Sequence, residues 1–358
     1  MASFLASCVF GVLDPLLTLP ASLTTQVLDY RARKTTTAQT SEPDSTLSNC
    51  RYPLDNSTSS TLTLPDSRTL SYAQYGSSAP TARAIFYLHG WPASRAEGTF
   101  LDAAAKHHNV RLISVDRPGI GQSSPQPNRT ILSHAHDIET LAEHLQLARY
   151  GVLGVSGGGP YALACARVLP AHRLQVVSLV CALGPPDIGY WGMYPLHYLG
   201  WTYGHRYLPQ FTRWWFSREP GARLDLSDKA RMDMLLRAFE QDRPKMHPKD
   251  ARLFGDVDFW KAHIRRSNDV YAQGADGVVQ DGKLLASNPG FRVEDIRKDL
   301  KVLLWYGRLD RNVPLRHGEE IARRLGDGAE LTVREDDTHA SVFLDWREEI
   351  LGEMVKAM

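Results

Sequence analysis

The sequence has few cysteines, and that scarcity excludes several kinds of protein. Only four occur among 358 residues, at Cys8, Cys50, Cys165 and Cys181, and no two of them form a C-x-x-C pair. A disulfide framework or a zinc site built on cysteine pairs is therefore not expected. Cys165 and Cys181 stand among apolar residues, which predicts that they are small core residues.

An excess of charge of either sign is also absent. The 41 basic and 40 acidic residues give a net charge of +1, whereas a domain that binds nucleic acid normally carries a basic excess. No long run of one charge sign suggests an interaction tail. Hydrophobic residues make up 43% and charged residues 23% of the chain, as is usual for a globular protein. We therefore expect no nucleic-acid partner.

The first thirty residues contain an apolar stretch that is too interrupted to span a bilayer. No lysine or arginine occurs from Ser3 to Leu28, and Asp14, Pro15 and Pro20 break the run. Three interpretations stay open: a helix docked on its own domain, a helix lying in a membrane interface, and an atypical secretory signal. Because the basic start of a secretory signal is missing, an intracellular location is favoured, with membrane contact through residues 1–34 as an alternative.

The composition divides the rest of the chain into three parts. Residues 35–59 begin with a Thr/Ser-rich stretch and are predicted to be a flexible linker. Residues 60–184 and 291–358 form the predicted core. Residues 185–290 are helical and rich in aromatic side chains. They are either a cap over an apolar pocket or extra helices packed on the domain, and the large amphipathic rings favour a cap.

Within the core, apolar strands alternate with helices. A hairpin is predicted from strands at 61–64 and 69–75, followed by strands at 84–88, 110–115, 150–155, 175–183, 302–306 and 330–333. Helices are predicted after Ser133 as N-cap and at 160–168, 315–325 and 340–356, with 231–239 and 258–272 in the insertion. This alternation is typical of a mostly parallel sheet that is covered on both faces.

The residues Gly154-Val155-Ser156-Gly157-Gly158 form the G-x-S-x-G pattern of a nucleophile elbow. A serine that is exposed on such a sharp turn leaves no room for side chains two residues away, and Gly154 and Gly158 supply that room. A predicted strand precedes the pentapeptide and a predicted helix with Pro160 in its first turn follows it. We therefore predict Ser156 as the nucleophile.

A serine hydroxyl needs a neighbouring base, and position selects among thirteen histidines. His339 follows the last predicted strand by a short polar loop, so it can reach the carboxyl edge of the sheet where Ser156 lies. His317 falls inside a predicted helix. The following histidines are predicted to be solvated surface residues: His107, His108, His134, His136, His144 and His172.

The base in turn needs an orienting acid at a strand end. Asp310 follows the strand at 302–306 in a turn bounded by Gly307 and Pro314, and Asp187 follows the strand at 175–183. We favour Asp310 because Asp187 opens the insertion. The order Ser156, Asp310, His339 is the chain order known for such triads on an α/β sheet.

Acyl transfer also needs donors for a developing oxyanion. The residues His89-Gly90-Trp91-Pro92 directly follow the strand at 84–88. Gly90 lets the loop approach closely, so the backbone N–H groups of Trp91 and Gly157 are the predicted donors. His89 is expected to stabilise the loop rather than to transfer a proton.

These motifs carry a resemblance to a known family. Residues 60–345 resemble the α/β-hydrolase superfamily, with LPDSRTLSYAQYG, HGWP, DRPGIGQS, the elbow, GRLDRNVP and DTH in this order. HGWP and DRPGIGQS are similar to epoxide hydrolases and haloalkane dehalogenases, which use an aspartate at the elbow. Because this chain has Ser156 there, it resembles instead the capped serine esterases, lipases, acyl hydrolases and C–C hydrolases. The resemblance implies an α/β-hydrolase fold with an inserted helical cap.

The expected function is a serine hydrolase that cleaves an apolar or aromatic small-molecule ester through an acyl-enzyme, with no cofactor and no metal. Two alternatives stay open. One keeps the same triad for C–C bond hydrolysis or perhydrolase chemistry, and the other is a non-catalytic ligand-binding protein on the same fold.

Overall fold

A single eight-stranded sheet forms the centre of the described molecule, with strand order β1-β2-β4-β3-β5-β6-β7-β8. The computed structural model describes residues 45–358. The predicted apolar segment 1–34 and the first part of the predicted linker lie outside the described residues. The strands are β1 (Ser59–Thr63), β2 (Thr69–Gly76), β3 (Arg83–Leu88), β4 (Val110–Val115), β5 (Tyr150–Val155), β6 (Leu174–Val180), β7 (Lys301–Gly307) and β8 (Ala329–Arg334).

The direction of the strands confirms the predicted fold class. Strand β2 runs antiparallel to both β1 and β4, and every pairing from β4 through β3, β5, β6 and β7 to β8 is parallel. The predicted strand at 175–183 is shorter than expected, because β6 ends at Val180 and the chain turns at Cys181, whose φ is +40°. The carboxyl ends of the parallel strands meet at one edge of the sheet, where their loops converge.

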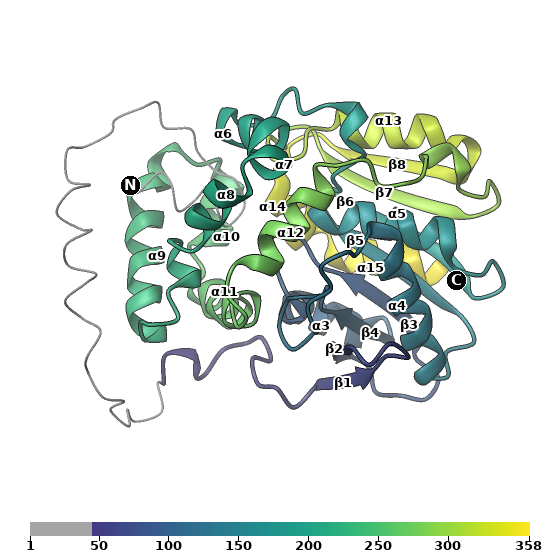
Figure 1. Ribbon diagram of the computed structural model, residues 1–358, viewed down its shortest axis with the longest axis horizontal. Coiled ribbons are helices and arrows are strands. Elements are labelled where there is room, and N and C mark those ends of the chain that lie inside the picture. The colour runs from purple at the N-terminus through teal and green to yellow at the C-terminus, as the bar shows by residue number, and fades with distance from the viewer. Residues whose placement is uncertain (1–44) are drawn as a thin grey trace.

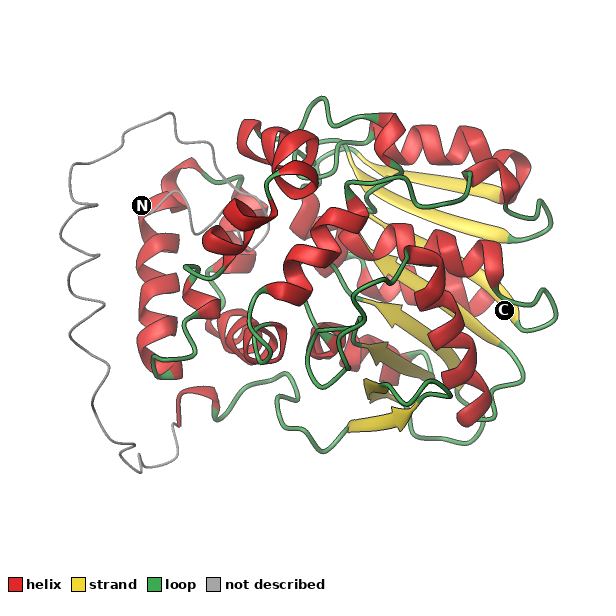
Figure 2. Ribbon diagram, in the orientation of Figure 1, coloured by secondary structure: helices red, strands yellow, loops and turns green. Residues whose placement is uncertain are grey.

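Helices cover both faces of the sheet, as Figures 1 and 2 show. Ala84, Phe86 and Leu88 of β3 face one buried cluster, and Ile85 and Tyr87 face the other. This alternation follows from the two-residue period of a strand. The covering helices are α3 (Asp102–His107), α4 (Ile131–His144), α5 (Gly159–Val168), α13 (Arg316–Leu325), α14 (His339–Asp345) and α15 (Arg347–Lys356).

The chain between β6 and β7 forms an insertion made of helices. Figure 1 shows these helices gathered at one end of the sheet. They are α6 (Pro195–Leu199), α7 (His205–Tyr207), α8 (Pro209–Phe216), α9 (Asp228–Asp242), α10 (Pro248–Phe254), α11 (Val257–Val270) and α12 (Asp276–Leu285). A π-helix, Gly200–Gly204, joins α6 to α7.

Two predicted helix boundaries are wrong. Thr130, not Ser133, is the N-cap of α4: its side chain accepts a hydrogen bond from the Ser133 N–H, and the Ser133 hydroxyl accepts one from the Thr130 N–H. Ser133 therefore occupies the third position of a capping box. The predicted helix at 340–356 is two helices, α14 and α15, because the backbone at Trp346 leaves the helical conformation.

Two other expectations also fail. Residues 45–59 do not form a flexible linker, because Lys261 and Arg265 of α11 donate hydrogen bonds to the carbonyls of Ser48 and Leu54. His134 is buried rather than solvated. Its ring packs edge-on against Tyr161 at 5.3 Å, and burial lowers its pKa to about 3, so the side chain is neutral. Cys165 and Cys181 are buried, as predicted.

No helix within residues 45–358 is both long enough and apolar enough to cross a lipid bilayer.

The position of β7 between β6 and β8 in the parallel sheet predicts a large cost in stability for truncating its core residues. Leu304 is fully buried between the sheet and its covering helices. We expect Leu304→Ala to lower the free energy of unfolding by about 2–5 kcal/mol, because it removes apolar contacts and leaves a cavity. Leu309→Ala, at an exposed position just beyond β7, should change it by less than about 0.5 kcal/mol. Urea unfolding of both variants measures the difference, and equal effects would contradict the place of Leu304 in the packed core.

Candidate active site

Ser156 lies at the sharp turn between β5 and α5, and its backbone has the positive φ of +51°. This left-handed conformation is rare for a residue with a side chain. The turn is possible because its neighbours are glycines. A Cβ placed on Gly154 would lie 2.6 Å from the Cβ of Ala162, and one on Gly158 would lie 2.0 Å from the carbonyl oxygen of Leu88. The strand–turn–helix setting predicted for Ser156 is therefore present.

Three of the predicted site residues come together although they are far apart in sequence. The Nε2 atom of His339, the first residue of α14, lies 3.1 Å from the Oγ atom of Ser156. The Nδ1 atom of His339 lies 2.7 Å from Oδ2 of Asp310. The other oxygen of Asp310 accepts hydrogen bonds from the backbone N–H groups of Asn312 and Val313 at 2.8 and 2.9 Å. The carboxylate is thus fixed in place by its own loop.

The rival acid Asp187 does not reach this group. Its side chain is 63% exposed and forms an ion pair with Arg324 at 2.7 Å. The strand end after β7, rather than the one after β6, supplies the carboxylate that contacts His339. Cys181 occupies the corresponding strand end after β6 and lines the same pocket.

Burial and the Asp310 carboxylate act on His339 in opposite directions. Burial by itself lowers the pKa of an imidazole, but the adjacent negative charge of Asp310, together with the contact to Cys181, outweighs it and raises the pKa of His339 well above 6.5. Burial raises the pKa of the Cys181 thiol, which therefore stays neutral beside the ring. The carboxylate thus makes His339 a stronger base than a free histidine.

The backbone of Trp91 lies beside Gly157, the residue that follows Ser156. A Cβ placed on Gly157 would lie 3.1 Å from the backbone nitrogen of Trp91, so the two peptide groups are neighbours. The N–H of Gly157 stands at the start of a helix, where backbone donors have no intrahelical acceptor. The N–H of Gly90 is already engaged, because it donates to Oε2 of Glu97 at 2.6 Å. The N–H of Gly90 is thus not free to bind a substrate, and the assignment of Trp91 and Gly157 as oxyanion donors stays a prediction.

A buried charge network fixes the loop that carries Trp91. The Nη1 and Nη2 atoms of Arg117 donate to the carbonyl oxygens of His89 and Gly90 at 2.7 and 2.6 Å. The Nε atom of Arg117 donates to Oδ2 of Asp281, on α12, at 2.6 Å. The network therefore ties the loop after β3 to the insertion.

Asp281 is the centre of this network. Its carboxylate also accepts hydrogen bonds from Arg129 and from the hydroxyl of Tyr161. Burial alone would raise the pKa of Asp281, but Arg117 and Arg129 lower it to about 2, so it is charged. His89, next to the network, has a pKa held well below 6.5 by burial and by the charge of Arg117. A neutral His89 fits the structural role expected for it.

The contacts of Arg117, Asp281 and Glu97 were not predicted from the sequence. The position of Arg117 could have indicated a role near the site, since it lies just after a predicted strand in DRPGIGQS. Nothing in the sequence indicated the contact of Asp281, because it lies in a helix of the insertion, 164 residues away from Arg117. Glu97, seven residues beyond Gly90, holds the N–H of that residue and pairs with Arg266 at 2.6 Å.

The site opens into an apolar cavity of about 500 Å³. Ser156 and His339 line it from the strand ends, and the helices α6 to α8 of the insertion line it from the other side. The ring of Trp91 packs against Trp201, His205 and Phe216 of these helices, with centroids 4.7–5.0 Å apart. Burial lowers the pKa of His205 to about 3, so this part of the wall is uncharged.

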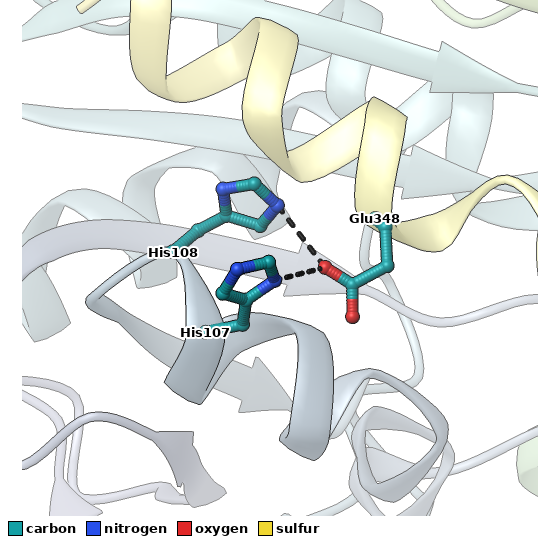
Figure 3. A group of neighbouring side chains, drawn as sticks. All are labelled: His107, His108 and Glu348. Carbon is teal, nitrogen blue, oxygen red and sulfur yellow. Dashed lines mark hydrogen bonds and ion pairs between the residues drawn. The ribbon is translucent and has the colours of Figure 1, made fainter.

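Two groups of described side chains lie close enough together to share a metal ion. One consists of Cys181, Asp310 and His339, whose imidazole and carboxylate are already joined by a hydrogen bond. The other is shown in Figure 3 and joins α3 to α15: Oε2 of Glu348 lies 2.9 Å from Nδ1 of His107 and 3.1 Å from Nε2 of His108. The side chain of His107 is 73% exposed, and we interpret this second group as a surface tie between the two helices.

A family model described as alpha/beta hydrolase fold matches residues 83–345. The chain therefore belongs to the α/β-hydrolase family. It is 24% identical over 258 residues to the AB hydrolase superfamily protein YisY of Bacillus subtilis, across 68% of this chain and 80% of that protein. A proline iminopeptidase of Xylella fastidiosa is 31% identical over 122 residues, across 32% of this chain and 37% of the peptidase.

Solved structures agree on the fold. The esterase EaEST from Exiguobacterium antarcticum matches with a TM-score of 0.55 and 22% identity, across 83% of this chain and 99% of the esterase. The enol-lactonase from Burkholderia xenovorans LB400 matches with a TM-score of 0.51 and 19% identity, across 83% of this chain and 99% of the lactonase. With the family assignment, the protein is a hydrolase of the α/β fold.

The two hydrogen bonds from the Arg117 guanidinium to the carbonyls of His89 and Gly90 predict that a substitution of Arg117 slows hydrolysis by displacing the loop after β3. Arg117→Lys keeps a positive charge near Asp281 but cannot hold the carbonyls of His89 and Gly90 together. We expect kcat for a soluble p-nitrophenyl ester to fall roughly 10- to 100-fold, less than the 10²–10³ that deletion of an oxyanion donor costs, with a smaller change in KM. Arg323→Lys, whose side chain on α13 is 69% exposed, serves as the control. Unchanged kcat in Arg117→Lys would show that the loop keeps its position without these two hydrogen bonds.

Proposed function

We propose that the protein is a serine hydrolase that cleaves the carboxylic ester, or a related acyl bond, of an apolar small molecule through an acyl-enzyme. The observation that carries the proposal is the hydrogen-bonded chain from Ser156 through His339 to Asp310, placed at the wall of an apolar cavity. Nucleophile, base and orienting acid stand in the geometry that acyl transfer requires.

In the first step, Nε2 of His339 takes the proton of the Ser156 hydroxyl as Oγ attacks the substrate carbonyl carbon. Asp310 holds Nδ1 protonated, so that Nε2 is the free acceptor, and stabilises the imidazolium that forms. The carbonyl oxygen becomes an oxyanion, and the N–H groups of Trp91 and Gly157 donate hydrogen bonds to it. His339 then gives its proton to the leaving alcohol, and the C–O bond breaks.

In the second step, water enters in place of the alcohol. His339 takes a proton from the water while the oxygen attacks the acyl carbon, and the same two N–H groups stabilise the second oxyanion. Collapse of this intermediate returns the proton to Ser156 and releases the acid. All groups needed for both steps belong to the chain itself.

The cavity favours an uncharged substrate. Its wall is built mainly from apolar and aromatic side chains, and the two charged residues that line it, Glu97 and Arg266, neutralise each other at 2.6 Å. A charged substrate would have to break this pair or lose its hydration without a partner. The proposed substrate is therefore a neutral apolar or aromatic ester.

The same pair bears on peptides with a free, cationic amino terminus as substrates, since the chain is similar to a proline iminopeptidase. A cationic amine in an apolar cavity needs a carboxylate to pair with. Glu97 accepts from Gly90, Tyr87 and Arg266, so its charge is already used inside the protein. This favours esters over amino-terminal peptides, and a substrate panel of esters, prolyl amides and vinylogous diketones separates ester, peptide and C–C bond cleavage.

Covalent labelling tests the role of Ser156. A fluorophosphonate probe should label the wild-type protein, because the activated hydroxyl attacks phosphorus, and Ser156→Ala should abolish both labelling and ester hydrolysis. Intact-mass spectrometry measures the adduct. Ser60→Ala, at an exposed position of β1, is a control that should leave labelling unchanged. Undiminished labelling of Ser156→Ala would remove this serine from the mechanism.

The pH dependence tests Asp310. His339 acts as a base only when neutral, and Asp310 raises its pKa above 6.5, so wild-type kcat/KM should rise with pH through a pKa above that value. In Asp310→Asn the raising charge is gone, so the rising limb should move to lower pH while kcat falls about 10⁴-fold.

Asp187→Asn is the matched control, since this residue is the rival carboxylate. It should leave both the rate and the position of the rising limb unchanged, because Asp187 pairs with Arg324 at the surface. A larger loss of turnover in Asp187→Asn than in Asp310→Asn would reverse the assignment of the acid.

A further inference from the structure

Large apolar side chains are exposed on the helices of the insertion. Helix α6, the π-helix and α7 follow one another without a break, and Leu196, Leu199, Tyr203 and Tyr207 recur every three or four residues along them. This spacing places them on one side of the helical segment. We call the exposed set of residues 191–214 the outer apolar face: Trp191, Leu196, Leu199, Tyr203, Tyr207, Leu208, Phe211 and Trp214.

This face is unusual for the molecule. Its eight residues are 38–76% exposed, and they are eight of the eleven large hydrophobic side chains that residues 45–358 expose. Gathered apolar surface of this kind marks an interaction site on a protein, whereas scattered exposed residues do not. Phe211 and Trp214 stack on each other at 5.6 Å, so part of the face is a continuous aromatic surface.

The opposite side of the same helices is also apolar. Trp201, His205 and Phe216 pack inward on Trp91. A helix that is apolar on one side finds enough burial in its own domain, but one that is apolar all round is typical of a segment that has a second apolar environment. The inner side has its environment in the cavity wall, and the outer apolar face still needs one.

The outer apolar face adjoins the cavity. Five of its members also line the cavity: Leu196, Leu199, Tyr203, Leu208 and Phe211. The side chains that meet solvent are therefore the ones that bound the space beside Ser156. An apolar molecule on the face therefore lies next to side chains that also bound the cavity.

The charge of the segment indicates the kind of partner. Between Ile188 and Arg218 the sequence contains no aspartate or glutamate, while the exposed residues Arg206, Arg213 and Arg218 supply positive charge. The guanidinium of Arg218 lies 4.3 Å from the ring centre of Trp214, and that of Arg206 lies 5.2 Å from the ring centre of Tyr207. Arg213 pairs with Asp276 at 2.5 Å. Tryptophan, tyrosine and leucine interleaved with arginine suit the head-group region of a bilayer with negative lipids.

We propose that the outer apolar face docks the protein on an anionic lipid surface, with its rings among the head groups and Arg206 and Arg218 near the phosphates. A symmetric contact with a second copy fits the observations less well. It would bring each face against itself, and a segment with arginines and no acidic residue offers no compensating charge. The docking does not depend on the proposed reaction, and only the passage of a lipid-dissolved ester into the cavity rests on it.

Vesicle binding tests the proposal with the full chain. The triple variant Trp191→Ser/Tyr207→Ser/Trp214→Ser changes three members of the face that do not line the cavity. In sedimentation with vesicles of phosphatidylcholine and phosphatidylglycerol, we expect its partition coefficient to be about tenfold or more below that of the wild type. The matched control Leu224→Ser/Val257→Ser changes exposed apolar residues outside the face and should bind like the wild type.

The charge contribution is measured separately. Arg206→Gln/Arg218→Gln should remove the preference for the anionic vesicles over pure phosphatidylcholine vesicles and leave binding to the latter unchanged. Hydrolysis of a short soluble ester should be the same in the triple variant as in the wild type, which shows that the variant is folded. If the protein hydrolyses no ester and the triple variant still loses vesicle binding, the proposed function fails and the docking stands.

Three outcomes would overturn the docking. One is wild-type vesicle binding by the triple variant, as would occur if residues 1–34 alone bound lipid. Another is an equal loss of binding in the control variant. The third is a dimer, detected by light scattering, that dissociates in the triple variant, since the face would then be an interface between copies.

Discussion

The left-handed backbone of Ser156 is the constraint on which the rest of the site depends. Such a conformation costs a side-chain-bearing residue roughly 1–2 kcal/mol, and it persists because the chain on either side is packed without room to relax. Gly158 lies against the end of β3 and Gly154 against α5. Since β3 and β5 are adjacent parallel strands, the same turn that exposes Oγ also places the N–H of Gly157 beside the loop that carries Trp91.

The pKa of His339 is shifted in the opposite direction to the pKa values of other buried histidines. His89, His134 and His205 are buried without a carboxylate that outweighs the loss of hydration, and each has a lowered pKa. His339 is equally enclosed but has Asp310 against its Nδ1 atom, and its pKa is raised. The Asp310 carboxylate is therefore the main difference between His339, whose pKa is raised, and the buried histidines whose pKa is lowered.

The sequence predicted the parts of the structure that local chemistry determines. The parallel sheet followed from apolar runs that alternate with helices, and Ser156, Asp310 and His339 followed from their places at strand ends. The wrong predictions concern positions where two local interpretations of the sequence were nearly equally good. Thr130 and Ser133 are both good N-caps, and only the reciprocal hydrogen bonds of the capping box distinguish them. His134 was assigned to solvent although Ile131, Ala135 and Ile138 on the same helix are all buried.

Contacts between residues that are distant in the sequence could not be predicted from it. Nothing local to Asp281 indicates that it pairs with Arg117, because the contact depends on how the insertion lies against the strand ends. The same is true of Glu97 and Arg266, which are separated by 169 residues. The outer apolar face was visible only as aromatic composition, since the sequence did not say which rings point inward toward Trp91.

Because Arg117 of the core pairs with Asp281 of the insertion, the insertion cannot be replaced without affecting the core. Asp281 belongs to the last inserted helix, α12, yet the arginine that it holds supports the loop after β3. A chimera that receives the helical segment of a relative would lose the anchor of its own loop after β3, unless the graft carried an equivalent carboxylate. In this protein, divergence of substrate preference is therefore confined to changes that leave one buried acid of the insertion in place.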